Sequence, residues 1–195
     1  GFDLEATVNA LATELGGGGD RGGASTITQQ LVRSRLLPSE VIEQGLSTQE
    51  GLYARKALEI IQAFKLTQAF PGEEGKKTIM TAYLNQNFYG NNSYGVKTAA
   101  RSYFGINDLS KLTLAQAAIL AGIPQAPGSF DLVRNAEETE VGDPRCPDRD
   151  TACLVVPADA PVVVRRNYIL RLLADDADRR VLSGDAYSAA DFREA

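Results

Sequence analysis

Apolar residues recur at intervals of three and four along most of this chain, and this spacing limits the possible folds more than any other feature. The period is clear over residues 2–15, where the apolar positions are Leu4, Val8, Leu11 and Leu15. Such a period places the apolar side chains on one face of an α-helix. Only residues 154–156 carry a brief strand-like run, and no internal repeat occurs. The sequence therefore predicts a mainly α fold.

Glycine and proline residues divide the chain into separate helical segments. The predicted helices cover residues 2–15, about 27–33, 53–70, 76–85, 93–103, 113–121, 162–174 and 189 onward. In the third of these, the side chains expected to face the core are Ala57, Leu58, Ile60, Ile61 and Phe64. Residues 38–52 are polar and contain Pro38 and Gly45, which predicts a loop with at most a short helix. Six of the eight prolines lie between positions 124 and 161, so residues 124–160 are expected to be irregular.

The size and charge of the chain exclude several classes of protein. With 195 residues and 44% hydrophobic residues, the chain can build a core, and we expect residues 1–195 to form a single domain. The net charge of −5 argues against a nucleic-acid partner, which would require a basic surface. The sequence holds no apolar run of 18 or more residues. It begins at Gly1 without an initiator methionine, and we interpret it as a segment of a longer protein.

The two cysteines, Cys146 and Cys153, lie close together in a segment rich in Pro and Asp. Their spacing fits no zinc motif, and the chain has no histidine that could complete one. They could form a disulfide if the protein resides outside the cytoplasm, or remain as two free thiols. The spacing alone does not separate these alternatives.

Residues 22–33, GGASTITQQLVR, form a glycine-rich turn that leads into a predicted helix. Thr26 and Gln29 match a capping box, in which each side chain binds the backbone N–H of the other residue. The unpaired N–H groups at such a helix start can bind an anion, and Arg33 follows two turns later. The same pattern also occurs as plain structure, which is the more common case.

Residues 55–59, RKALE, place two cations and one carboxylate on the same helical face. Glu59 follows Arg55 by four positions and Lys56 by three. One interpretation is a solvated helix face with an ion pair, which the residues alone favour. The other is a carboxylate kept ionised beside two cations that bind a phosphate.

Residues 84–105 hold a third motif, LNQNFYG followed by YGVKTAARSYFG. Its Asn and Gly residues suit tight turns, and its pair of alanines permits close helix packing. Most of these positions are expected to be scaffold.

Four stretches occur in order, namely GGASTITQQLVR, RKALE, LN-x4-G-x3-YGVKTAARSYFG and LTLAQAAILAGIPQAPGSFD. Together they resemble the family 51 glycosyltransferases, the peptidoglycan glycosyltransferases of class A penicillin-binding proteins and of monofunctional enzymes. The resemblance implies a lysozyme-like helical fold with a small membrane-associated jaw at residues 36–54. It implies polymerisation of lipid II into β-1,4 glycan strands, with inversion and release of undecaprenyl diphosphate. It also implies a location on the outer face of the bacterial cytoplasmic membrane.

The resemblance assigns roles to individual residues. It implies that Glu59 and Arg33 are catalytic and that Glu59 can hold a divalent metal, Mg or Mn, with no other cofactor. The substrate-binding residues that it implies are Ser25, Thr26, Gln29, Gln30, Arg55, Lys56 and Asn85. Departure of a diphosphate builds negative charge on phosphate oxygens, which fixed donors and cations stabilise. The implied partners are lipid II, the growing glycan strand, the membrane surface, a C-terminal transpeptidase domain and other cell-wall synthesis proteins.

The chain also departs from the family pattern. It begins just after the position of the family's first motif, which carries the glutamate thought to act as general base. We therefore expect this segment to lack the base, its membrane anchor to lie outside this chain, and the segment alone to be inactive. Gly51 stands where the family often has Arg, and Gln116 where it commonly has Glu, a position we expect to be structural. Residues 134–160 are expected to be an inserted loop.

Two other functions remain open. A non-catalytic domain could bind lipid II and act as a scaffold in the cell-wall synthesis machinery, and the missing first motif and Gly51 favour that alternative. A lysozyme-like hydrolase would share the fold, but it needs a protonated carboxylic acid beside the bond it cleaves. The four motifs belong to the transferases, so the hydrolase ranks last.

Overall fold

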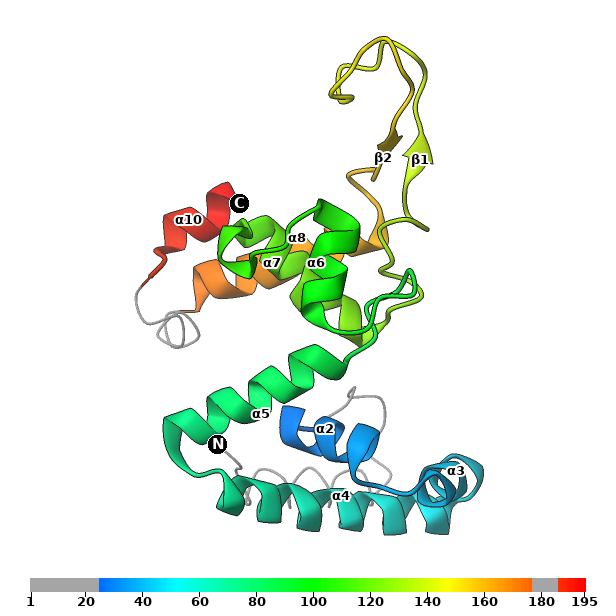
Figure 1. Ribbon diagram of the computed structural model, residues 1–195, viewed down its shortest axis with the longest axis vertical. Coiled ribbons are helices and arrows are strands. Elements are labelled where there is room, and N and C mark those ends of the chain that lie inside the picture. The colour runs from blue at the N-terminus through cyan, green and yellow to red at the C-terminus, as the bar shows by residue number, and fades with distance from the viewer. Residues whose placement is uncertain (1–24, 177–185) are drawn as a thin grey trace. The chain divides into compact units, whose positions relative to one another are not determined.

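The computed structural model of the protein describes residues 25–176 and 186–195. The chain divides into two compact units, Gly1–Leu84 and Asn85–Ala195. Helices dominate the described part of each unit, which confirms the predicted mainly α class (Figure 1). The helix predicted over residues 2–15 lies outside the described residues. Among the described residues, no helix is both long enough and apolar enough to cross a membrane.

The first unit is built around the long helix α4 (Gln49–Ala69). Helix α2 (Ile27–Arg35) packs against it, as does α3 (Ser39–Ser47). Helix α5 (Gly72–Gln86) follows, and its last two residues belong to the second unit. Over residues 25–84, the buried apolar side chains are Leu31, Val32, Ala63 and Ile79.

The prediction of a loop with at most a short helix over residues 38–52 is wrong, because α3 and the first turn of α4 occupy nearly all of this segment. Pro38 stands just before α3, a place where its fixed φ angle favours the start of a helix. Gly45 does not break α3, since it is buried against α4. Thr48 then caps α4 by accepting a hydrogen bond from the Gly51 amide at 3.0 Å. Polar composition was therefore a poor guide to this segment.

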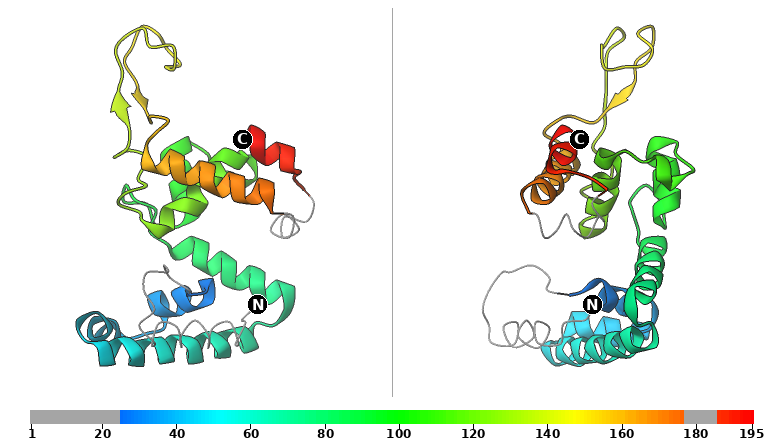
Figure 2. Two further views of the ribbon diagram at one scale, coloured as in Figure 1. Left: turned by 180° about the vertical axis from the view of Figure 1, so that it is seen from behind. Right: turned by 90° about the vertical axis from the view of Figure 1, so that its left-hand side faces the viewer.

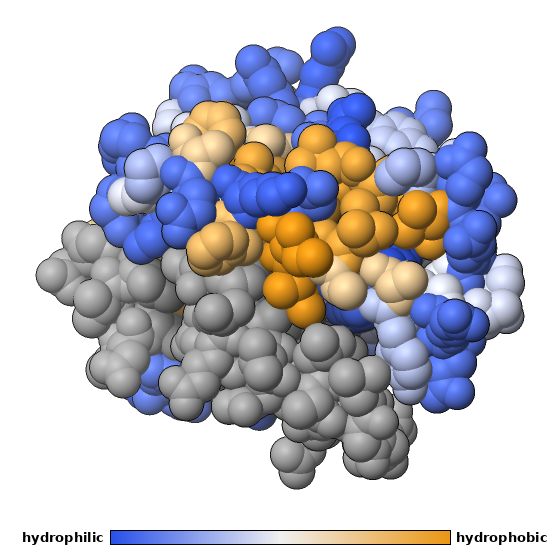
Figure 3. Space-filling view, turned by 90° about the horizontal axis from the view of Figure 1, so that it is seen from below, coloured by the Kyte–Doolittle hydropathy of each residue, from blue (hydrophilic) through white to orange (hydrophobic). Residues whose placement is uncertain are grey.

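The side chains of α4 predicted to face inward lie mostly on the outside. Ile61 is 49% exposed and Phe64 is 44% exposed, whereas the buried positions of α4 are Arg55, Glu59 and Ala63. Figure 3 views the molecule from the side on which α4 lies in Figure 1, and apolar side chains gather there. The spacing of the apolar residues correctly located an apolar stripe on α4. It did not identify the face of α4 that packs against α2. The face that packs against α2 carries Arg55 and Glu59, and Arg33 of α2 pairs with Glu59.

The second unit contains α6 (Val96–Phe104), α7 (Leu114–Gly122), α8 (Pro161–Asp175) and α10 (Ala189–Glu194). Helix α7 packs on α8, and α8 packs on α10 (Figure 2). Short 3₁₀ turns cover Leu109–Lys111 and Ile123–Gln125. The main core cluster comprises Tyr89, Ala99, Ala100, Ile119, Leu120, Ile123, Ala160, Val162 and Val163. The predicted helices of this unit are thus confirmed to within a few residues.

The segment predicted to be irregular contains one small antiparallel ribbon. Strand β1 (Glu137–Glu138) pairs with β2 (Leu154–Val155), and the pairing places Glu137 opposite Val155. The short strand expected near residues 154–156 is therefore present, but its partner was not predicted. Cys146 and Cys153 form a disulfide, which decides between the two alternatives that their spacing left open. Arg145 hydrogen-bonds to the half-buried Asp143 and lowers the pKa of that carboxyl to about 2.

Thr139 attaches β1 to the disulfide loop. Its hydroxyl accepts a hydrogen bond from the Cys153 amide at 3.0 Å, and its own amide donates to the Cys153 carbonyl at 2.9 Å. Replacing both cysteines with serine should speed hydrogen exchange at these two amides by about tenfold or more, because the loop is no longer closed. Exchange at the buried Leu120 amide in α7 should stay unchanged. Equal acceleration at Leu120 would show that the disulfide supports the whole unit instead.

Candidate functional site

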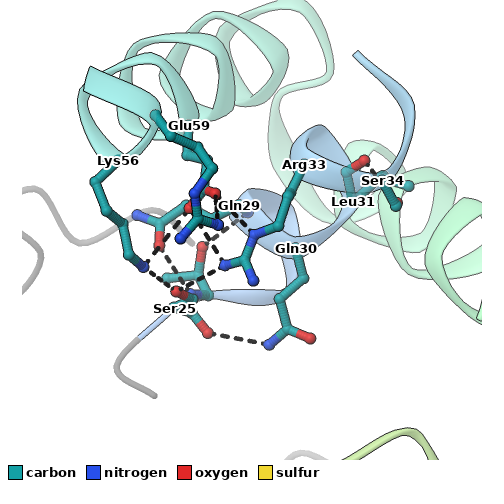
Figure 4. A network of polar contacts seen from close by, with 10 residues as sticks. Ser25, Gln29, Gln30, Leu31, Arg33, Ser34, Lys56 and Glu59 are labelled. Carbon is teal, nitrogen blue, oxygen red and sulfur yellow. Dashed lines mark hydrogen bonds and ion pairs between the residues drawn. The ribbon is translucent and has the colours of Figure 1, made fainter. Parts of the chain in front are cut away.

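The start of α2 is fixed by the predicted capping box. The backbone N–H of Gln29 donates to Thr26 Oγ1 at 3.2 Å, and the backbone N–H of Thr26 donates to the side-chain oxygen Gln29 Oε1 at 3.1 Å. Both contacts satisfy donors that a helix start leaves unpaired. The box sets the angle at which the chain enters α2, so that Ser25 and Arg33 lie on the side facing α4 (Figure 4).

Glu59 is the centre of a polar cluster between α2 and α4. It lies on the same face of α4 as Arg55 and is fully buried, with 0% of its side chain exposed. Arg55 Nη1 donates to Glu59 Oε1 at 2.9 Å from one turn away. Lys56 Nζ lies 3.6 Å from Glu59 Oε2. The interpretation as a solvated helix face is therefore wrong, because none of this carboxylate contacts solvent.

Arg33 reaches the same carboxylate from α2. Its Nε donates to Glu59 Oε1 at 2.7 Å, and its Nη2 donates to Oε2 at 3.3 Å. This two-point contact uses the planar fork of the guanidinium, which a lysine could not reproduce. The residues are far apart in sequence, so only the packing of α2 on α4 brings them together.

Ser25 connects the cations on the side away from Glu59. Its hydroxyl accepts hydrogen bonds from Lys56 Nζ and, at 3.4 Å, from Arg33 Nη2. Two positively charged donors thus converge on one neutral oxygen (Figure 4). An anionic oxygen at this position would satisfy the same donors more strongly than a hydroxyl does.

The charges of the cluster do not balance. Counting the described residues alone, three cations, Arg33, Arg55 and Lys56, surround the single carboxylate of Glu59, which leaves two positive charges in excess. Arg33 is the most accessible of them, with 35% of its side chain exposed. A partly buried excess of positive charge is a favourable place for an anion, because low local polarity strengthens the attraction. The arrangement suits a ligand that carries more than one negative charge.

Two buried donors of the cluster have no acceptor among the described residues. They are Gln29 Nε2 and Arg55 Nε. Gln29 is only 2% exposed, so water outside the protein does not easily reach this amide. Buried polar groups normally have partners, and an unpartnered one is a feature of ligand-binding positions. Gln29 Nε2 is consistent with a polar ligand or ordered water at the cluster, whereas Arg55 Nε lies against Gly45.

Gln30, another predicted binding residue, is placed by two contacts. Its Nε2 donates to the Ser25 carbonyl at 3.2 Å, and its Oε1 accepts from the Tyr83 hydroxyl at 3.1 Å. Tyr83 was not predicted, and its position late in α5 gave no signal for this role. Gly45 was also missed, although a glycine within a helical pattern often marks a close approach.

Gly45 provides the space in which Arg55 lies. A Cβ atom at this position would come within 2.5 Å of Arg55 Nε and 2.7 Å of its Cδ. Changing Gly45 to Ala should therefore lower the free energy of unfolding by about 1–3 kcal/mol, since Arg55 must leave its buried position. Gly128→Ala is the matched control, because its new Cβ would meet its nearest neighbour at an ordinary 3.8 Å. Urea denaturation of both variants measures the difference, and equal stabilities would contradict this packing.

The surroundings of Glu59 fit a metal poorly. Both carboxylate oxygens already contact cations, and the described residues contain no group of three or more acidic, His or Cys side chains that could hold an ion. A divalent cation would also add charge to a cluster that is already positive. Metal binding by Glu59 stays a prediction, and no step of the chemistry below depends on it.

Two further predicted positions lie in the second unit. Asn85 is exposed near the end of α5, and its binding role stays a prediction. Gln116 closes a capping box with Thr113 at the start of α7, so the expected structural role is confirmed. An amide performs this role as well as a carboxylate does.

Comparison with known proteins places these residues in a family context. The sequence profile of the transglycosylase family matches residues 1–146. This range includes every member of the cluster around Glu59.

The chain is also similar to several penicillin-binding proteins. It is 38% identical over 140 residues to penicillin-binding protein 1A of Streptococcus oralis, a match that covers 72% of this chain and 20% of that protein. It is 37% identical to penicillin-binding protein 1A of Haemophilus influenzae, with 72% and 15% covered. It is 36% identical to penicillin-binding protein 1A/1B of Bacillus subtilis, with 72% and 14% covered. The chain thus spans a fifth or less of the length of these relatives.

Proposed function

Because the chain belongs to the transglycosylase family, we propose that it polymerises lipid II into peptidoglycan glycan strands. The proposed donor is the growing strand, and the proposed acceptor is the 4-hydroxyl of an incoming lipid II. The cluster around Glu59 is the proposed binding site for the diphosphate of the donor.

The observation that carries this proposal is the excess of positive charge in the cluster. Arg33 and Lys56 converge on the Ser25 hydroxyl, while Glu59 holds both cations in place from the other side. A diphosphate beside Ser25 would accept hydrogen bonds from these same two donors. In the part of the cluster that the structure describes, both oxygens of the Glu59 carboxylate already contact cations, so the suitable task of the cluster is electrostatic.

The proposed reaction breaks one bond and forms another. The acceptor oxygen attacks the anomeric carbon of the donor, the new glycosidic bond forms with inversion, and the bond from that carbon to the diphosphate oxygen breaks. Negative charge grows on the departing diphosphate, where Arg33 and Lys56 stabilise it. Glu59 then has a positioning role, since both of its oxygens remain paired with cations. The acceptor hydroxyl gives up its proton to water as the new bond forms, and none of the described residues is assigned to accept it.

The disulfide between Cys146 and Cys153 supports a location outside the cytoplasm. Disulfides persist mainly in oxidising compartments. We therefore propose that the domain acts on the outer face of the cytoplasmic membrane, where the membrane surface presents lipid II and α3 of the proposed jaw, residues 36–54, contacts it. Leu36 and Leu46, which are 54% and 79% exposed, are the apolar contacts available there. A transpeptidase domain in the same protein and other cell-wall synthesis proteins are the proposed partners.

The test is polymerisation of fluorescent lipid II by the full-length protein in detergent, with the products separated on a gel. A ladder of glycan strands is the expected result. Lipid II binding without any ladder would overturn the transferase proposal and favour the non-catalytic scaffold. Shortening of preformed strands, with no ladder from lipid II, would indicate a hydrolase instead.

A further inference from the structure

A hairpin in the second unit presents two aromatic rings that the proposed diphosphate chemistry does not use. Phe88 and Tyr94 lie directly opposite each other in an antiparallel bridge. Their ring centroids are 5.0 Å apart, with the planes inclined at 41°. Phe88 is 39% exposed and Tyr94 is 64% exposed. Two large rings therefore form one exposed aromatic pair.

The alternation of side chains across the hairpin explains why both rings face outward. Successive residues in extended backbone point to opposite sides. Tyr89 follows Phe88 and is fully buried, while Ser93 precedes Tyr94 and is 2% exposed. The Tyr89 amide donates to the Ser93 carbonyl at 2.8 Å, which fixes the register. The inner side of the hairpin thus belongs to the core, and the outer side carries the rings.

Hydrogen bonds to neighbouring segments fix the position of the hairpin. The buried Asp131 carboxylate accepts a hydrogen bond from the Asn91 amide at 2.6 Å, and the Tyr103 hydroxyl donates to the Tyr89 carbonyl at 2.7 Å. Burial, together with the nearby Asp131 carboxylate, raises the pKa of Tyr103, so this hydroxyl keeps its proton. Gly90 has a φ angle of +78°, and a Cβ there would lie 2.8 Å from Asp131 Oδ2. A ligand would therefore meet rings that are already positioned, which lowers the entropic cost of binding.

We propose that the Phe88–Tyr94 aromatic pair is a saccharide-binding platform that stacks against the N-acetylated pyranose rings of a glycan strand. This inference rests on the proposed function, which supplies such a strand as substrate and product. A pyranose ring has an apolar face of C–H bonds and a rim of polar groups. Aromatic rings bind the apolar face, and the Tyr94 hydroxyl can hydrogen-bond to the rim.

The size of the pair favours a sugar over a protein partner. A stable protein interface buries on the order of 1,200–2,000 Å² in total, with about 20–30 residues on each side. Two rings on a short hairpin offer far less than this area. They match one or two sugar rings in size, and a strand of many sugars can compensate for the weak binding of each one through repeated contacts.

The test uses the full-length protein and a soluble tetrasaccharide of alternating N-acetylglucosamine and N-acetylmuramic acid, which carries neither lipid nor phosphate. Its affinity is measured by NMR titration. Phe88→Ala and Tyr94→Ala should each weaken binding by about tenfold. Tyr94→Leu should weaken it as well, because an apolar side chain without a ring cannot stack. Tyr168→Ala, which removes a 51% exposed tyrosine from α8, is the matched control and should bind as the wild type does.

Separate readouts distinguish failure of this inference from failure of the proposed function. Tetrasaccharide binding that survives in Phe88→Ala and Tyr94→Ala, or that is lost equally in Tyr168→Ala, would overturn the platform. So would a wild-type protein that does not bind the tetrasaccharide at all. The Arg33→Ala variant should bind the tetrasaccharide normally while losing polymerisation of lipid II. If the wild-type protein did not polymerise lipid II, the transferase proposal would be refuted, but the measured binding of the tetrasaccharide would still stand.

Discussion

Changing Glu59 to Gln should both destabilise the protein and stop glycan polymerisation. Among the described residues, Glu59 is the only carboxylate that pairs with Arg33, Arg55 and Lys56, and the change removes it. Breaking a buried ion pair on one side typically costs about 3–5 kcal/mol, because the remaining charges lose their partner without regaining water. Arg33, Arg55 and Lys56 would then also lose the contacts that fix their positions. We expect urea denaturation to show a loss of free energy of unfolding in this range. We also expect the variant to form no glycan ladder from lipid II.

Glu74→Gln provides the matched control for this change. Glu74 forms an ion pair with Lys77 at 2.7 Å on α5, but 85% of its side chain is exposed. Removing it should change the free energy of unfolding by less than about 0.5 kcal/mol and leave polymerisation intact. Equal effects of the two substitutions, or a stable and active Glu59→Gln protein, would show that the burial of Glu59 has no functional meaning.

Changing Arg33 to Ala should reduce kcat/KM for polymerisation by about 100- to 1,000-fold, which is typical for the loss of one donor that stabilises a developing anion. The effect on stability should be smaller than that of Glu59→Gln. Arg33 is partly exposed, and Arg55 and Lys56 remain to compensate Glu59. A substitution with large kinetic and small thermodynamic effects is the signature of a residue that contacts the substrate.

Two further substitutions show whether charge or geometry is responsible. Arg33→Lys keeps the charge but loses the fork that contacts both oxygens of Glu59, so kcat/KM should lie between the wild-type and alanine values. Arg171→Ala removes an exposed arginine from α8 and should leave polymerisation unchanged.

Binding of inorganic pyrophosphate, followed at increasing salt, should weaken in Arg33→Ala but not in Arg171→Ala. Unchanged pyrophosphate binding in Arg33→Ala would place the diphosphate elsewhere.

Local sequence signals predicted most helix boundaries correctly. The capping box of Thr26 and Gln29 located the start of α2, and Gly105, in a left-handed conformation at φ +69°, ends α6 as expected. These signals succeed because each depends on atoms within a few residues along the chain. The segment 38–52 is the exception, since the glycine that suggested a break is accommodated by packing against Arg55.

Contacts between distant segments could not be predicted in the same way. The disulfide between Cys146 and Cys153 was only one of two alternatives, because spacing does not determine how two thiols are oriented. The roles of Tyr83 and Gly45 depend on neighbours in other helices. The inward face of α4 was predicted wrongly for a related reason. An apolar stripe shows where a helix can be buried, but not which partner covers it.

The amino-acid sequence is enough to predict the mainly helical class, the order of the motifs and the residue types available for anion binding. The burial of Glu59 and its contact with Arg33 follow from the packing of α2 on α4, which no local signal in the sequence predicts. A charged side chain is stable in a protein interior only when other segments supply compensating charges and hydrogen bonds, and these partners come from a separate helix.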